Sequence, residues 1–126
     1  SFYTDSPRLG VRNIHAAEKS QDRLGATLWQ QPQKYVQHSA IMFADRIKTP
    51  LLLITGAQDS NVPADNTREM YFALRRLDKE VTWVNYINGG HGGGNATVDD
   101  FLDMHRRMLE FYDAKLKRPN DKVATR

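Results

Sequence analysis

The most regular apolar pattern in the chain lies between residues 49 and 91. Leu51 to Thr55 forms an unbroken apolar run, and a second run, Val81 to Ile87, is rich in the residue types that strands prefer. An unbroken run is typical of a strand that is buried on both faces of a parallel sheet. Pro50 suits the start of such a strand because it has no N–H to donate. We therefore predict two parallel strands.

A helix is predicted between these strands, because apolar residues recur at helical spacing from about Asp65 to Leu77. Asn66 and Glu69 are placed as a capping box near its start. Strand, helix and strand in this order make one β-α-β crossover between parallel strands. The pattern thus predicts an α/β fold.

The longest apolar stripe belongs to a last helix that begins near Thr97. Thr97 and Asp100, three residues apart, resemble a helix cap. The stripe consists of Val98, Phe101, Leu102, His105, Met108, Leu109, Tyr112 and Leu116. Beyond Pro119 no periodicity remains, so residues 119–126 are predicted to form a disordered tail.

The N-terminal part of the chain has a weaker pattern. Residues 1–30 carry few apolar residues, interrupted by glycine and proline, and this predicts mostly loop with one short helix around Ala16 to Leu24. Pro32 suits the first turn of another short helix, and Ile41 to Ala44 predict a further turn. These segments are expected to pack around the edge of the sheet.

Composition excludes several classes of protein. The 126 residues suit one domain, and the formal charge of +3 comes from interleaved acids and bases, such as Asp45 beside Arg46, which argues against nucleic-acid binding. The chain has no cysteine, and therefore no disulfide, thiolate zinc site or cysteine nucleophile. No window approaches the roughly 18 apolar residues of a membrane span. Ser1 is not an initiator residue, so we expect a fragment of a longer polypeptide.

Two side chains with catalytic chemistry follow the predicted strands. Asp59 comes after the first strand and His91 after the second, and functional residues of open parallel sheets lie on such loops. A carboxylate bonded to histidine Nδ1 fixes the tautomer in which Nε2 can take a proton from a hydroxyl. Glycines around His91 allow a tight loop. The residue types fit equally well an Asp59 that caps a turn and a His91 that is merely exposed.

Six segments between about Leu24 and Lys117 match those of a known family in order and spacing. They are R-L-G-A-T-L-W-Q-Q-P-Q-K-Y, I-K-T-P-L-L-L-I-T-G, D-S-N-V-P, F-A-L-R-R-L-D-K, V-N-Y and G-H-G. Through these segments the chain resembles the C-terminal part of the α/β-hydrolase domain of the prolyl oligopeptidase family of serine peptidases. This family includes dipeptidyl peptidases and acylaminoacyl peptidases.

The resemblance implies that Asp59 is the acid and His91 the base of a Ser-Asp-His triad, in the chain order of α/β hydrolases. The D-S-N-V segment is similar to the signature of the dipeptidyl peptidase branch. There the Asn helps to hold a substrate carbonyl, and the Val lines the pocket for the residue before the scissile bond. Asn61 and Val62 occupy these positions. The alternative is a turn Asn and a core Val.

The chain departs from the family pattern at the nucleophile. No G-x-S-x-G elbow occurs in the sequence, and none of its five serines has the flanking glycines. The resemblance thus implies that the Ser and the oxyanion donors lie upstream, and that residues 1–118 are the C-terminal portion of the catalytic domain. A smaller departure is Asp78, which ends a helix where the family usually has Gly.

We expect a part of a serine-type peptidase that acts on short peptides, with no cofactor and no metal. His15, His38 and His105 have no metal-ligand spacing. An esterase or lipase-like α/β hydrolase is the second interpretation. A non-catalytic, self-associating module is the third, because two strands alone leave sheet edges unpaired. The expected partners are a peptide substrate and either the rest of the catalytic domain or a second copy.

One further motif is Asn95-Ala96-Thr97, which matches an N-glycosylation acceptor. The pattern is short and occurs often by chance. It has meaning as a modification site only in a protein that passes through a eukaryotic secretory route.

Overall fold

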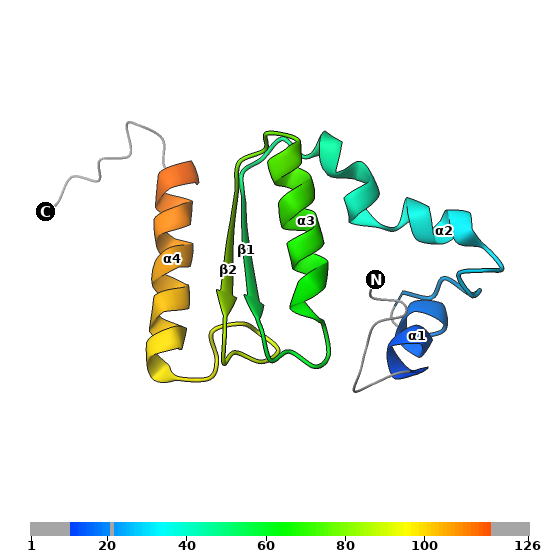
Figure 1. The fold of residues 1–126 in the computed structure, drawn as a ribbon, viewed down its shortest axis with the longest axis horizontal. Coiled ribbons are helices and arrows are strands. Elements are labelled where there is room, and N and C mark those ends of the chain that lie inside the picture. Colours follow the sequence, from blue (N-terminus) through cyan, green and yellow to red (C-terminus); the bar gives the residue numbers. More distant parts are fainter. Residues whose placement is uncertain (1–10, 21, 117–126) are drawn as a thin grey trace, which may run out of the picture.

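The computed structural model describes residues 11–20 and 22–116. The predicted loop at residues 1–10 and the predicted tail at 119–126 lie outside the described residues. The elements in chain order are α1 (Val11–Glu18), α2 (Pro32–Gln37), the 3-10 helix η1 (Ala40–Arg46), β1 (Leu51–Gly56), α3 (Ala64–Arg76), β2 (Val81–Tyr86) and α4 (Val98–Leu116) (Figure 1).

The two strands form a parallel sheet with helices on both sides. Leu51 of β1 pairs with Val81 of β2, and the register continues to Gly56 opposite Tyr86. Figure 1 shows α3 on one side of the sheet and α4 on the other. The predicted β-α-β crossover and the α/β class are therefore confirmed.

The core lies between α3, η1 and the sheet. Its buried residues are Ala44, Leu74 and Val81, and Leu74 is completely buried. The half-buried side chains around them are Ile47, Leu51, Leu53, Met70, Tyr71 and Ala73. The core thus joins the crossover helix to the segment that precedes β1.

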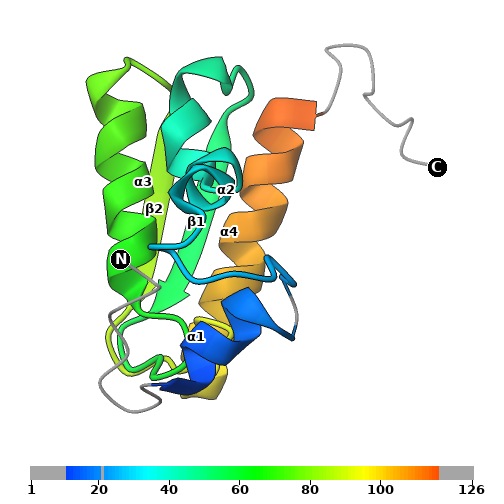
Figure 2. The same ribbon diagram turned by 90° about the vertical axis from the view of Figure 1, so that its right-hand side faces the viewer.

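The N-terminal helices α1 and α2 lie on the same side of the sheet as α3, at a distance from the strands (Figures 1 and 2), and α2 contacts η1. The short helix at Pro32 is confirmed. A short helix is also present before it, but the predicted bounds, around Ala16 to Leu24, are wrong, because α1 spans Val11–Glu18. There the chain turns back, with Gly25 N–H bonded to Glu18 O and Arg23 at φ +52°. These turn contacts compete with continuation of the helix.

The two ends of α3 differ from the prediction in their details. The capping box at Asn66 and Glu69 is wrong, because Pro63 occupies the N-cap position and no side chain caps the helix. At the other end Asp78 has φ +53° and Lys79 N–H donates to Leu74 O at 2.9 Å. This is the bonding pattern of a left-handed helix end, formed here without the usual glycine.

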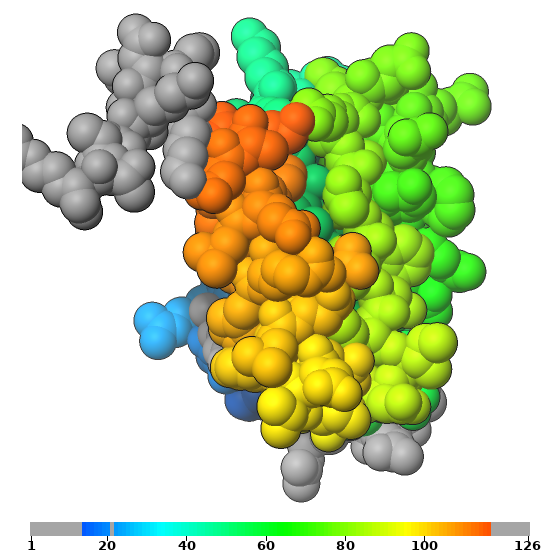
Figure 3. All heavy atoms as spheres, turned by 90° about the vertical axis from the view of Figure 1, so that its left-hand side faces the viewer, coloured from blue at the N-terminus to red at the C-terminus, as the bar shows by residue number. Residues whose placement is uncertain are grey.

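Burial of β1 and of α4 is lower than the apolar patterns predict. Residues 51–55 of β1 are half-buried, so the expected burial on both faces is wrong, because β1 has one neighbouring strand among the described residues. On α4, Met104, Met108 and Phe111 are half-buried, while Leu109 and Leu116 of the apolar stripe are exposed. Figure 3 shows that α4 forms the outer surface on its side.

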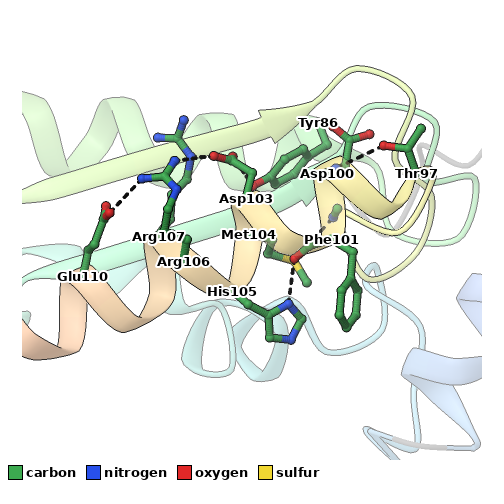
Figure 4. A network of polar contacts seen from close by, with 11 residues as sticks. Tyr86, Thr97, Asp100, Phe101, Asp103, Met104, His105, Arg106, Arg107 and Glu110 are labelled. Atoms are coloured by element: carbon green, nitrogen blue, oxygen red, sulfur yellow. Dashed lines mark hydrogen bonds and ion pairs between the residues drawn. The ribbon is translucent and has the colours of Figure 1, made fainter.

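A polar network fastens α4 to the end of β2 (Figure 4). The buried Tyr86 hydroxyl donates to Asp103 Oδ2 at 2.9 Å, and Arg107 Nε donates to the same oxygen at 2.7 Å. Arg106 bonds both Asp103 and Glu110. Hydrogen bonds from Arg107, Tyr86 and Arg106 lower the pKa of Asp103 to about 2. The network contributes to the position of the β2–α4 loop.

The start of α4 is capped as predicted. Thr97 Oγ1 accepts the Asp100 N–H at 3.0 Å, and Thr97 O accepts the Phe101 N–H at 3.1 Å (Figure 4).

In the part of the chain that the structure describes, no helix has both the length and the apolar character of a membrane span.

A pair of leucine substitutions tests the placement of the core. Leu74→Ala removes a completely buried side chain, and we expect it to lower the free energy of unfolding by about 2–5 kcal/mol. Leu77→Ala, at a position 42% exposed, is the matched control and should cost less than about 1 kcal/mol. Urea unfolding followed by circular dichroism measures both. Equal losses would contradict this assignment of the core.

The Asp103 network predicts an acid-dependent contribution to stability. The pKa of Asp103 is lowered from 3.8 to about 2, so the contribution is complete above pH 3.8 and is lost as pH falls through about 2. We expect the stability difference between wild type and Asp103→Asn to be constant at pH 5–7 and to shrink towards pH 2. Urea midpoints across this range measure it, and a pH-independent difference would contradict the prediction.

Candidate active site

Asp59 organises the loop that follows β1. Its Oδ1 atom accepts the backbone N–H groups of Asn61 at 2.8 Å and Val62 at 2.9 Å. Aspartate commonly closes turns in this way, because its short side chain reaches N–H groups two and three residues ahead. The turn leads directly into α3 and holds the Asp59 carboxylate at the carboxyl end of the sheet.

The second oxygen of Asp59 contacts His91. Asp59 Oδ2 lies 2.9 Å from His91 Nδ1, although the residues are 32 positions apart. A carboxylate only accepts, so Nδ1 carries the proton in this contact and a neutral ring has Nε2 as its acceptor. The Asp59 side chain is 9% exposed and the His91 side chain is 66% exposed. Asp59 therefore makes two kinds of contact: one oxygen closes a turn and the other contacts histidine.

Opposing effects act on the pKa of Asp59. Burial of the carboxyl raises its pKa, but hydrogen bonds from the N–H groups of Val62 and Asn61, together with His91, lower it further, so the net shift is downward. Asp59 is therefore ionised at neutral pH. An ionised carboxylate beside Nδ1 stabilises a positive charge on the imidazole.

A close approach of two backbones brings these loops together. A Cβ atom at Gly56 would lie 2.2 Å from Gly89 O and 2.3 Å from Gly90 O, which is closer than real Cβ atoms come. Gln58 N–H donates to Gly89 O at 2.9 Å, and Gln58 Nε2 donates to Ile87 O at 3.2 Å. The sequence shows Gly56 only as the end of an apolar run, so its structural role was missed.

The glycine-rich loop after β2 fits between β1 and α4. Gly93 is buried at φ +83°, and a Cβ there would lie 2.8 Å from Ile54 Cγ2. Gly94 is also buried, and its added Cβ would lie 2.7 Å from Asp100 O. The expected role of glycine in a tight loop beside His91 is thus seen in the packing of the loop.

Val62 and Asn61 have different surroundings. Val62 is partly exposed and lines a cavity of about 810 Å³ between the N-terminal segments and the start of α3. Tyr35, Met42 and Met70 are among the other lining residues. Asn61 is exposed in the Asp59 turn and does not line this cavity.

The described residues 11–20 and 22–116 hold no group of three or more His, Cys, Asp or Glu side chains that could bind a metal ion. They also contain no G-x-S-x-G segment. The groups that the structure brings together at the ends of the strands are the Asp59 carboxylate and the His91 imidazole.

A family model for the prolyl oligopeptidase family matches residues 9–119. The chain belongs to the prolyl oligopeptidase family. The match extends over both strands, the Asp59 turn and the His91 loop.

Two curated peptidases are similar to this member of the prolyl oligopeptidase family over about half of its length. They are the uncharacterized peptidase YuxL of Bacillus subtilis (strain 168), 27% identical over 64 residues, and dipeptidyl peptidase family member 6 of Caenorhabditis elegans, 33% identical over 60 residues. The matches cover 51% and 48% of this chain, but 10% and 8% of the relatives.

Solved structures of acylaminoacyl peptidases share the fold. One, in complex with Z-Gly-Gly-Phe-chloromethyl ketone, has a TM-score of 0.65 and 29% identity, covering 71% of this chain and 15% of that chain. The uncomplexed Pyrococcus horikoshii acylaminoacyl peptidase has a TM-score of 0.65 and 28% identity, and the match covers 73% of this chain and 15% of that peptidase. These are α/β hydrolases, and the two parallel strands with flanking helices are a partial α/β fold.

The close approach of the two loops predicts that Gly→Ala substitutions at residues 56 and 90 differ in their effect. Gly56→Ala forces a Cβ into the Gly89 carbonyl, and we expect a loss of about 1–3 kcal/mol in stability and of the Asp59–His91 contact. Gly90→Ala is the control, because its Cβ would meet only Asn95 Oδ1 at 3.9 Å. Urea unfolding and the His91 Nδ1–H resonance measure both effects. An intact contact in Gly56→Ala would contradict the prediction.

Proposed function

We propose that this chain supplies the acid and the base of a serine-type peptidase that hydrolyses peptide bonds in short peptides. Asp59 is the triad acid, His91 is the base, and the nucleophilic Ser belongs to residues upstream of Ser1. The observation that carries the proposal is the 2.9 Å contact between Asp59 Oδ2 and His91 Nδ1 at the ends of neighbouring parallel strands. Membership of the prolyl oligopeptidase family supports a peptidase-type hydrolase.

The proposed mechanism divides the work between the two side chains. His91 Nε2 takes the proton of the Ser hydroxyl as its oxygen attacks the peptide carbonyl, and then gives this proton to the leaving amine. Water repeats the sequence to release the acyl group. Asp59 holds the ring in the Nδ1–H tautomer and stabilises the imidazolium without taking the proton. The exposed side of His91 is where the Ser and the substrate would lie.

Substrate binding is proposed to involve the D-S-N-V turn. Val62 lines the 810 Å³ cavity, whose lining includes neither Asp59 nor His91, so the family resemblance of the D-S-N-V turn is the main support for Val62 as one wall of the pocket for the residue before the scissile bond. Asn61 is exposed in the same turn, where its side chain would help to hold a substrate carbonyl. The reagent bound to the similar acylaminoacyl peptidase is peptide-like, which agrees with a peptide substrate for the proposed enzyme.

The rest of the catalytic domain is the proposed macromolecular partner. Phe101, Leu102, Leu109 and Leu116 of the α4 stripe are all exposed in this chain. Large apolar side chains grouped on one surface favour contact with another protein surface. A second copy of the chain is the alternative occupant, and would correspond to a non-catalytic, self-associating fragment.

An esterase-type hydrolase is the second candidate function. A protein assigned as a dienelactone hydrolase, from Klebsiella pneumoniae, has a TM-score of 0.50 and 25% identity, and covers 57% of this chain. The acylaminoacyl peptidases match more of the chain with a higher TM-score, which favours the peptidase. A dipeptidyl anilide and the corresponding ester distinguish the two, because an esterase cleaves only the ester at a useful rate.

The triad assignment predicts large losses of activity in the parent protein that contains the upstream residues. We expect His91→Ala and Asp59→Asn each to lower kcat/KM for a dipeptidyl chromogenic anilide by about 10⁴-fold. His15→Ala, at an exposed histidine of α1 that does not line the cavity, is the matched control and should leave kcat/KM unchanged. The 126-residue chain alone should show no hydrolysis. Activity of the lone chain that disappears with His91→Ala would refute an upstream nucleophile.

A further inference from the structure

The side chain of Asn95 forms hydrogen bonds on both sides of His91. Asn95 Oδ1 accepts the Gly90 N–H at 2.9 Å, and Asn95 Nδ2 donates to His91 O at 2.8 Å. The backbone N–H of Asn95 also donates to Gly93 O at 2.9 Å. One carboxamide thus bonds the N–H that precedes His91 and the C=O of His91 itself, much as a paired strand would.

These hydrogen bonds matter because the backbone around His91 is conformationally flexible. Gly90 and Gly92 flank the histidine, and glycine loses more conformational freedom on folding than any other residue. The His91 side chain is 66% exposed, so packing gives the ring little orientation. The Asp59 contact needs the His91 backbone to be in place already. Two hydrogen bonds from one rigid, planar group restrict the dihedrals on either side of the ring.

We infer that Asn95 is a positioning residue that holds the His91 backbone in the conformation in which Nδ1 meets Asp59. The inference deepens the proposed function, because it matters for catalysis only if His91 is the base. Asn95 touches neither Asp59 nor the exposed side of the His91 ring in these contacts, so its effect on chemistry is indirect.

The same contacts give a second explanation for the Asn95-Ala96-Thr97 motif. The Nδ2 atom to which a glycan would be attached is the atom that donates to His91 O. Thr97 of the motif caps α4 through its hydroxyl. Both polar residues of the motif therefore have structural partners, and no glycan is needed to explain their presence.

Nuclear magnetic resonance of the 126-residue chain tests the inference without a nucleophile or a substrate. In Asn95→Ala we expect Gly90 amide exchange to be about fivefold faster or more, because one hydrogen bond is lost. We also expect the neutral His91 ring to shift from the Nδ1–H towards the Nε2–H tautomer, read from its nitrogen shifts. Asn88→Ala, an exposed Asn of the preceding turn, should change neither.

A second variant keeps the test valid if Asn95→Ala does not fold. Asn95→Asp has the same shape and retains the acceptor for Gly90 N–H, but it places a carboxylate oxygen against His91 O. We expect Gly90 protection to persist and the Nδ1–H tautomer to decrease. The inference would be overturned if Asn95→Ala kept the Gly90 exchange rate and the His91 tautomer of the wild type. It would also be overturned if Asn95→Asp kept the wild-type His91 tautomer.

The test of the Asn95 positioning role can be distinguished from the test of the proposed triad. If His91→Ala retains full activity in the parent protein, the proposed triad is wrong, whereas Gly90 exchange and the His91 tautomer still decide the role of Asn95. If Asn95→Ala leaves both signals unchanged while His91→Ala abolishes activity, the positioning role is wrong and the triad stands.

Discussion

The contact between the two loop backbones at Gly56 is the constraint on which the rest of the site depends. Parallel pairing ends with Gly56 opposite Tyr86, and the loops then continue side by side, with Ala57 N–H bonded to Tyr86 O and Gln58 N–H to Gly89 O. A side chain at residue 56 would separate these backbones. Because Asp59 follows three residues later, the missing Cβ sets the distance across which the carboxylate meets His91.

Asp59 links this constraint to the electrostatics of the pair. The two N–H groups that close its turn also stabilise the negative charge, and they counter the burial that would otherwise raise the pKa of the carboxyl. The same D-S-N-V turn places Val62 at the wall of the cavity. A single local structure thus orients the carboxylate, keeps it ionised and positions a neighbouring side chain beside the empty space.

The sequence predicted those features that depend on local periodicity or on the ends of strands. Both strands, α3 and α4 follow from apolar spacing, and the meeting of Asp59 with His91 follows from their places after parallel strands. Features that depend on tertiary contacts were not predictable in the same way. The end of α1 is set by a turn around Arg23, and the half-burial of β1 depends on which strands lie beside it. The role of Asn95 requires the loop conformation itself.

The described core is small, since Leu74 is its one completely buried large side chain, so apolar packing alone gives little precision at the ends of the strands. The site instead relies on short-range polar contacts: the Asp59 turn, the Asn95 carboxamide and the Tyr86–Asp103 bond that fastens α4 to β2. Such contacts define geometry within one loop or between neighbouring loops. They do not cover the exposed ring of His91 or the α4 stripe. Orientation of the Asp59–His91 pair is therefore a local property, whereas the exclusion of water that the proposed catalysis would need requires a surface that the described residues do not provide.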